Sequence, residues 1–163
     1  MTQVAGRTEA FIGLGANLGD ARAAVTQAIA QIAQLPQTRL VRQSSLYRCA
    51  PVDASGDDYV NAVVEIATGL SPLELLRELQ QLELQADRQR PYRNAPRTLD
   101  LDILLYGDMQ LDSPELTIPH SRLWQRGFVV LPLAEIAPAR VSAAQRLAVS
   151  AEVSGQILNK LLK

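Results

Sequence analysis

Residues 97–107 read Arg-Thr-Leu-Asp-Leu-Asp-Ile-Leu-Leu-Tyr-Gly, so two aspartates lead directly into an apolar run. Such a run predicts a β-strand, and residues i and i+2 of a strand point to the same face of the sheet. Asp100 and Asp102 are therefore expected side by side. Neighbouring carboxylates repel each other unless a cation lies between them, and Mg²⁺ is commonly held by one or two carboxylates together with substrate phosphates. Spacing alone also fits a solvated pair on an edge strand.

Outward from this strand, the chain shows strand and helix patterns in the order β-α-β-β-α-β. Apolar residues predict strands over 9–15, 40–47, 59–68 and 100–106, and helical spacing predicts helices over 21–35 and 71–86. Ser71-Pro72-Leu73-Glu74 is a capping box with proline at the first helical position. This order is typical of the ferredoxin-like arrangement, an antiparallel sheet with both helices on one face.

The C-terminal part predicts further helices. Short ones are expected at 121–125 and 130–136, and a last one near 155–162. They could cover the second face of the sheet, which would give an α+β fold with three layers, αβα. At 163 residues, we expect residues 1–163 to form one domain.

Composition narrows the chemistry. The net charge of −1 gives no global field that favours nucleic acid or an anionic membrane. The 16 basic residues include only two lysines, Lys160 and Lys163, which excludes a Walker-type lysine and makes Schiff-base chemistry improbable. One histidine, His120, and one cysteine, Cys49, cannot build a usual zinc site. Carboxylates, arginines and a carboxylate-bound metal remain as catalytic equipment.

The same composition bears on location and partners. A single cysteine excludes an internal disulfide and fits a reducing cytosol. Neither a membrane-spanning run nor a signal-peptide pattern is found in the sequence. We therefore expect a cytoplasmic monomer that binds small molecules, and neither nucleic acid nor membrane.

Residues 96–102, Pro-Arg-Thr-Leu-Asp-Leu-Asp, resemble the signature of the 6-hydroxymethyl-7,8-dihydropterin pyrophosphokinase family of folate biosynthesis. The resemblance extends over about residues 10–138. It implies an α+β fold and transfer of pyrophosphate from ATP, the co-substrate, to 6-hydroxymethyl-7,8-dihydropterin, with AMP as the second product. It also implies that Asp100 and Asp102 hold two Mg²⁺ ions that bridge the enzyme to the ATP phosphates.

Four arginines fall within residues 88–97, just before the aspartates. Such a run is often only a solvated charged loop, but its place favours a loop that closes on a polyphosphate. The resemblance implies that Arg88 and Arg97 are catalytic. It implies nucleotide contacts for Gln80, Glu83, Arg90, His120 and Arg126.

Tyr59 and Asn61 share one face of a predicted strand, and a flat heteroaromatic ring needs an aromatic stack and a few fixed polar groups. On residues alone, a core tyrosine and a strand-end asparagine are equally good readings. The resemblance implies a pterin pocket formed by Cys49, Ala50, Val52, Tyr59, Asn61 and Phe128.

The sequence departs from the family pattern in two places. Asn94-Ala95 replaces the usual Trp-Gly before Pro-Arg, and Glu115 stands where some members carry an arginine. The loop at 13–20 has the spacing Gly-x-Gly-x-x-x-Gly, which does not match a dinucleotide-binding fingerprint. Two other function classes stay open on the residues: another metal-dependent phosphoryl-transfer enzyme, such as a phosphohydrolase, and a non-catalytic ligand-binding module.

Overall fold

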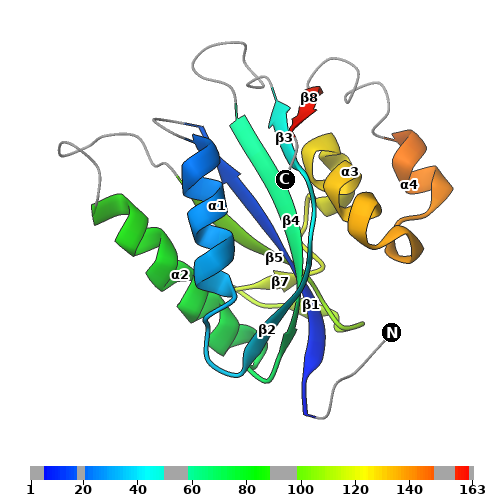
Figure 1. Ribbon diagram of the computed structural model, residues 1–163. Coiled ribbons are helices and arrows are strands. Elements are labelled where there is room, and N and C mark those ends of the chain that lie inside the picture. The colour runs from blue at the N-terminus through cyan, green and yellow to red at the C-terminus, as the bar shows by residue number, and fades with distance from the viewer. Residues whose placement is uncertain (1–5, 18–20, 50–58, 89–98, 149–156, 162–163) are drawn as a thin grey trace.

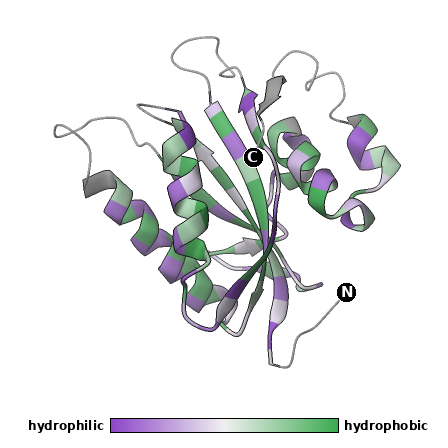
Figure 2. Cartoon of the chain, viewed as in Figure 1, coloured by the Kyte–Doolittle hydropathy of each residue, from purple (hydrophilic) through white to green (hydrophobic). Residues whose placement is uncertain are grey.

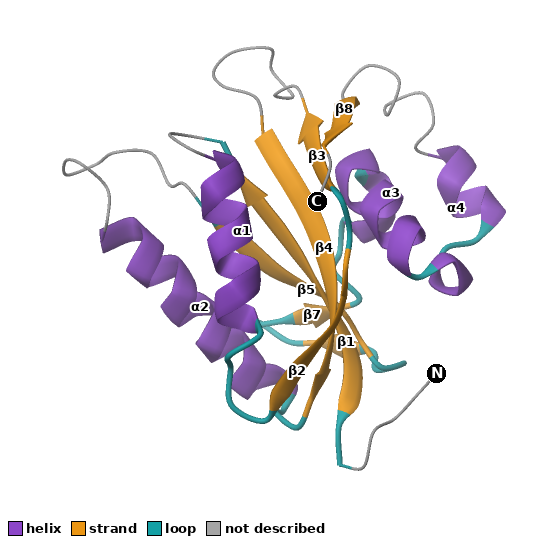
Figure 3. Cartoon of the chain, viewed as in Figure 1, coloured by secondary structure: helices purple, strands orange, loops and turns teal. Residues whose placement is uncertain are grey.

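A computed structural model describes residues 6–17, 21–49, 59–88, 99–148 and 157–161 (Figure 1). Its strands and helices are coloured by type in Figure 3. The strands are β1 (Thr8–Ala16), β2 (Thr38–Gln43), β3 (Leu46–Cys49), β4 (Tyr59–Thr68), β5 (Asp100–Tyr106), β6 (Leu111–Asp112), β7 (Thr117–Ile118) and β8 (Ile157–Leu161). The helices are α1 (Ala21–Ile32), α2 (Pro72–Arg88), η1 (Leu123–Gln125), α3 (Gly127–Ile136), η2 (Pro138–Arg140) and α4 (Ala143–Ala148).

The main sheet is antiparallel, with strand order β5-β1-β4-β3-β8, and β2 pairs with β4 beyond the end of β3. The prediction of one continuous strand over 40–47 was wrong, because the strand breaks at Ser44 and Ser45. Ser44 N–H donates to Val63 O at 2.9 Å, and the Ser44 hydroxyl accepts from Val63 N–H at 3.0 Å. A side-chain oxygen thus replaces a backbone acceptor at the break.

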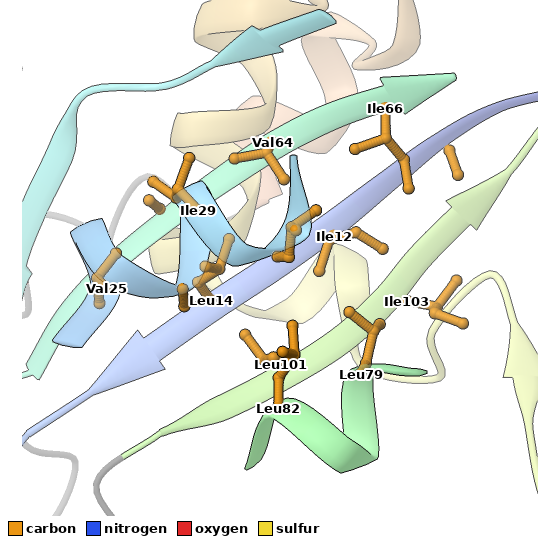
Figure 4. Packing of buried hydrophobic residues seen from close by; sticks show 14 of the residues in the cluster. Ile12, Leu14, Val25, Ile29, Val64, Ile66, Leu79, Leu82, Leu101 and Ile103 are labelled. Carbon is orange, nitrogen blue, oxygen red and sulfur yellow. The ribbon is translucent and has the colours of Figure 1, made fainter. Parts of the chain in front are cut away.

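One face of the sheet is covered by α1 and α2, as predicted. Figure 4 shows Val25 and Ile29 of α1, and Leu79 and Leu82 of α2, packed over apolar residues of β1, β4 and β5. Along β1, alternate residues from Ala10 to Ala16 belong to this core, which is the two-residue period of a strand. The amphipathic pattern of α2 is visible in Figure 2, where apolar and polar residues lie on different sides of the helix.

The opposite face is covered by α3 and the segments next to it. Phe11 of β1, Val63 of β4 and Leu104 of β5 form a second core with Leu123, Val129, Val130, Leu133, Ile136 and Val141. Helices therefore pack on both faces of an antiparallel sheet, and the α+β class is confirmed. In Figure 1, the sheet lies between the α1/α2 pair and α3.

Local signals explain the start of α2. Ser71 N–H donates to Glu74 Oε1 at 2.8 Å, and Glu74 N–H donates to the Ser71 hydroxyl at 3.2 Å. This is the predicted capping box, which satisfies N–H groups that have no partner inside the helix and is worth about 1 kcal/mol.

The prediction of a helix near residues 155–162 was wrong, because residues 157–161 form β8. Its backbone pairs antiparallel with β3, with Leu161 opposite Leu46 and Ile157 opposite Cys49. The edge of β3 would otherwise present unpaired N–H and C=O groups, and a strand satisfies them where a helix would not. Residues 111–118 form the short β6-β7 hairpin.

None of the helices in the described residues is long and apolar enough to cross a membrane.

Candidate active site

The two aspartates lie at the start of β5 on the face that carries α3. Leu101 and Ile103 point into the α1/α2 core, so Asp100 and Asp102, which alternate with them, point to the other face. Asp100 is exposed and Asp102 is half-buried. The side-by-side arrangement expected from the spacing is therefore present.

A cross-strand row connects Asp100 to the residues predicted to bind pterin. Gly15 of β1 lies opposite Asp100 on one side and Asn61 of β4 on the other, and Asn61 lies opposite Tyr47 of β3. Two residue pairs further along, on the same face, Gly13 lies opposite Asp102. Four strands thus contribute to one continuous strip of the sheet.

Glycine at position 15 leaves room for a side chain from the next strand. A Cβ on Gly15 would lie only 2.8 Å from the Asn61 Oδ1, closer than real Cβ contacts allow. Asn61 itself is buried, with 6% of its surface exposed. The amide of Asn61 therefore lies over Gly15, between Tyr47 and Asp100 in this row of paired residues.

Tyr59 and Cys49 lie at the ends of β4 and β3 and pair with each other. Tyr59 is half-buried and Cys49 is buried. Because i and i+2 share a face, Tyr59 lies on the same face as Asn61. Burial and a position beside the Asn61 row are consistent with packing for the Cys49 side chain.

Arg126 and Phe128 lie at the start of α3. The Arg126 guanidinium carbon is 5.6 Å from the centroid of the Phe128 ring, a cation–π contact. Phe128 is half-buried and packs against the second core. The arrangement brings a cation and an aromatic ring to the same helix end.

His120 follows a cis Ile118–Pro119 peptide bond and is held by its backbone N–H, which donates to Leu104 O at 3.0 Å. The Nδ1 of His120 accepts from Arg122 N–H at 3.2 Å, which leaves the proton of the neutral ring on Nε2. Burial lowers the pKa of His120; the charge of Asp102 opposes this, and those of Arg126 and Arg122 add to it. His120 is therefore a neutral donor at pH 7 within the electrostatic reach of Asp102 and Arg126.

Glu83 of α2 contacts the backbone between the two aspartates. Its Oε2 accepts from Leu101 N–H at 2.8 Å. Gln80, one turn earlier on α2, is exposed. Of these two predicted residues, the structure brings Glu83 to the start of β5.

Several predicted residues lie outside the described part of the chain, or at its margin. Arg88 is the last residue of α2, and Glu115 is exposed between β6 and β7. Outside the described residues are Ala50, Val52, Arg90 and Arg97, together with the Asn94-Ala95 departure.

Asp100 and Asp102 fit a magnesium site better than a zinc site. Among the described residues, no group of three or more His, Cys, Asp or Glu side chains could hold a metal ion. Two oxygen-donor carboxylates, with the remaining positions left to phosphate and water, match the coordination that Mg²⁺ prefers. Zinc would require a closed set of nitrogen or sulfur ligands.

Sequence reasoning missed Glu135. It is the only charged residue in α3, whose sequence is Gly-Phe-Val-Val-Leu-Pro-Leu-Ala-Glu-Ile. Its carboxylate accepts hydrogen bonds from Ser45, which precedes β3, and from Tyr47 within β3. A lone acid in an otherwise apolar helix was the available signal. A half-buried acid needs hydrogen-bond donors, and which residues supply them depends on tertiary structure.

An antiparallel sheet that presents paired carboxylates beside a neutral histidine and arginines has the equipment of an α+β phosphoryl-transfer enzyme. The sequence model of one family, 7,8-dihydro-6-hydroxymethylpterin-pyrophosphokinase (HPPK), matches residues 11–138. The chain belongs to this family, and it is an ATP-dependent enzyme of the pyrophosphokinase class.

Two curated relatives carry the name 2-amino-4-hydroxy-6-hydroxymethyldihydropteridine pyrophosphokinase. The protein of Pseudomonas aeruginosa is 45% identical over 129 residues, which are 78% of this chain and 80% of the relative. The protein of Haemophilus influenzae is 48% identical over 129 residues, or 78% and 81% of the two chains.

Solved structures of longer HPPK-DHPS proteins share the fold. One from Plasmodium falciparum, a triple mutant, has a TM-score of 0.71 at 12% identity and covers 96% of this chain. Another, described as HPPK-DHPS in complex with substrates, has a TM-score of 0.73 at 11% identity and the same 96% coverage. This chain spans 48% of each of those longer chains.

Proposed function

We propose that this chain transfers the pyrophosphoryl group of ATP to the hydroxymethyl group of 6-hydroxymethyl-7,8-dihydropterin, with Asp100 and Asp102 as the metal-binding residues. Family membership supports the reaction itself. The assignment of residues rests on one observation: Asp100 and Asn61 flank the same glycine, Gly15, on the same face of the sheet. The ATP phosphates at Asp100 and the pterin at Asn61 would then lie on either side of β1.

The reaction forms one bond and breaks one. The substrate hydroxyl oxygen bonds to the β-phosphorus of ATP, the bond from that phosphorus to the oxygen bridging the α-phosphorus breaks, and AMP leaves with that oxygen. The hydroxyl proton passes to solvent. Mg²⁺, when bound at Asp100 and Asp102, would neutralise phosphate charge and acidify the hydroxyl. The presence of two ions is part of the proposal.

The chain's own contribution is positioning and charge. His120, neutral with its proton on Nε2, would donate a hydrogen bond to a phosphate oxygen, and Arg126 would add a fixed positive charge beside it. We assign Arg90 and Gln80 to the nucleotide as well. Arg88 and Arg97 would stabilise the charge that develops during transfer.

The pterin would lie at the other end of the strip. Asn61 would hydrogen-bond to the polar edge of the ring system. Tyr59 and Phe128 would supply the aromatic faces, and the segment Cys49, Ala50 and Val52 would offer backbone groups. The burial of Asn61 supports this role, because a buried amide that receives a ligand discriminates strongly between ligands.

We further propose that the core is the ferredoxin-like arrangement within a single domain that acts as a monomer. The order β5-β1-β4 followed by β3 and β2, with α1 and α2 on one face, supports the assignment.

The proposal is tested by measuring AMP formation from MgATP with and without the pterin. For the protein as it stands, we expect AMP only when the pterin is present. Asp100→Asn should lower the rate at least a hundredfold, because a neutral amide replaces a metal-binding carboxylate. Asp112→Asn, at an exposed aspartate of β6, is the matched control and should keep the full rate. Near-normal turnover by Asp100→Asn would overturn the metal assignment.

A further inference from the structure

Glu135, near the C-terminal end of α3, holds that helix to the sheet through its carboxylate. Both carboxylate oxygens accept from Ser45 N–H, each at 3.1 Å. The Ser45 hydroxyl donates to Oε2 at 2.9 Å, and the Tyr47 hydroxyl donates to Oε1 at 2.8 Å. Hydrogen bonds to an ionised acceptor are among the stronger ones in proteins.

The hydrogen-bond donors lie where the chain passes from β2 to β3. Ser45 directly precedes β3, at the break between β2 and β3, and Tyr47 lies within β3. Tyr47 is buried, and burial raises its pKa far above the ordinary value; its hydrogen bond to Glu135 and the charge of that residue add to the effect. The hydroxyl therefore stays protonated and keeps donating to the carboxylate.

Both elements joined by this contact, α3 and β3, lie next to or carry residues that we assign to the pterin. On the sheet, Tyr47 lies directly opposite Asn61. On α3, Phe128 precedes Glu135 by seven residues, which is about two helical turns, so both residues lie on the same side of the helix. Glu135 thus joins α3, which carries the aromatic ring, to β3, which pairs with the strand that carries the amide.

We propose that Glu135 is a positioning residue for the pterin subsite, setting the separation between Phe128 and Asn61 through its hydrogen bonds to Ser45 and Tyr47. The inference rests on the proposed function. Glu135 acts through its neighbours and takes no part in the chemistry. Its loss should therefore appear in pterin recognition before it appears in the rate of the chemical step.

The test compares the kinetic constants of two variants with those of a matched control. Glu135→Gln keeps the shape of the side chain but removes the charge and one acceptor oxygen. Tyr47→Phe removes only the hydroxyl. Tyr106→Phe is the control, because Tyr106 is an equally buried tyrosine whose hydroxyl donates to Leu70 O on the α1/α2 side of the sheet.

We expect the KM for pterin to rise about tenfold in Glu135→Gln and about threefold in Tyr47→Phe, with kcat and the KM for ATP within about twofold of the unaltered protein. Tyr106→Phe should lower the melting temperature as Tyr47→Phe does and leave the pterin KM unchanged. If Tyr47→Phe and Tyr106→Phe affect the pterin KM equally, the contact is merely structural and the inference is overturned.

Different results would contradict the proposed function and the role of Glu135. Absence of pterin-dependent AMP from the unaltered protein would contradict the proposed function. Normal activity of the unaltered protein together with an unchanged pterin KM in folded Glu135→Gln or Tyr47→Phe would contradict the role of Glu135 alone.

Discussion

Glu83 accepts a hydrogen bond from the backbone N–H of Leu101, the residue between Asp100 and Asp102, at 2.8 Å from Oε2 to N. The contact ties α2 to the first residues of β5, where both aspartates lie. A side chain on one face of the sheet thereby fixes the backbone that presents carboxylates on the other face. The geometry of the proposed metal site depends on this tie.

We predict that Glu83→Ala lowers kcat about tenfold or more, whereas Glu83→Gln stays within about threefold of the unaltered protein. Alanine leaves the Leu101 N–H without its acceptor, which costs about 1–3 kcal/mol, while glutamine keeps a carbonyl oxygen in place. Steady-state kinetics at saturating MgATP check this. Glu78→Ala, on the same helix, is the control and should be nearly neutral. Equal losses in the alanine and glutamine variants would show that the hydrogen bond to Leu101 is not what matters.

Gly15→Ala should weaken pterin binding. The added methyl group would lie 2.8 Å from the Asn61 Oδ1, so the amide must move away from its position over the sheet. We expect at least a tenfold higher Kd for the pterin, measured by calorimetry, because a displaced amide loses its hydrogen bonds to the ring edge.

Gly13→Ala is the matched control on the same face of β1. Its new Cβ would meet the Leu104 Cδ2 at 3.2 Å, a flexible side-chain end that can give way by a few tenths of an ångström. Pterin affinity in this variant should stay within about threefold. A similar loss in both variants would point to general disturbance of β1 and away from Asn61.

The Glu65 carboxyl should make stability depend on pH in a direction opposite to that of most acids. Burial raises its pKa above the ordinary value, and the nearby Glu9 carboxylate raises it further. Arg42, at 3.7 Å from Nε to Oε1, and Arg140 oppose the shift without cancelling it. Glu65 thus binds its proton more tightly in the folded than in the unfolded chain.

The stability that Glu65 contributes is therefore fully present below about pH 4.5 and is lost as the pH rises through the folded pKa. Glu65→Gln cannot ionise, so it should gain stability relative to the unaltered protein as the pH is raised from about 4.5 toward neutral. Urea unfolding at a series of pH values measures the difference.

Glu74→Gln should change the pH dependence of stability in the opposite direction. Hydrogen bonds from Ser71, its backbone N–H first, lower the pKa of Glu74, so the stability that Glu74 contributes is present above about pH 4.5 and is lost as the pH falls. This variant should lose stability relative to the unaltered protein as the pH rises toward that value. Parallel slopes for Glu65→Gln and Glu74→Gln would contradict the assignment.

Elements with strong local signals were predictable from the sequence. The alternation of apolar residues and the capping box at Ser71 predicted the bounds of β4 and the start of α2 to within a residue. Both signals depend on residues that are close in the sequence. The break at Ser44 and the strand β8 were missed. Both depend on partners distant in the sequence, Val63 in one case and β3 in the other.

The candidate site divides in the same way. The side-by-side placement of Asp100 and Asp102 follows from their spacing on a strand, and the structure shows it. Glu135 could not be placed, because its donors Ser45 and Tyr47 lie about ninety residues earlier and meet it only through the packing of α3 on the sheet. The roles of the site residues stay predictions.

The most direct measurement incubates the protein with MgATP and 6-hydroxymethyl-7,8-dihydropterin, then separates nucleotides and pterins by chromatography. Pyrophosphoryl transfer predicts AMP and pterin diphosphate in equal amounts, with no AMP when the pterin is left out. Formation of ADP, or of AMP without the pterin, would contradict the account and indicate ordinary kinase or hydrolase chemistry at the same aspartates.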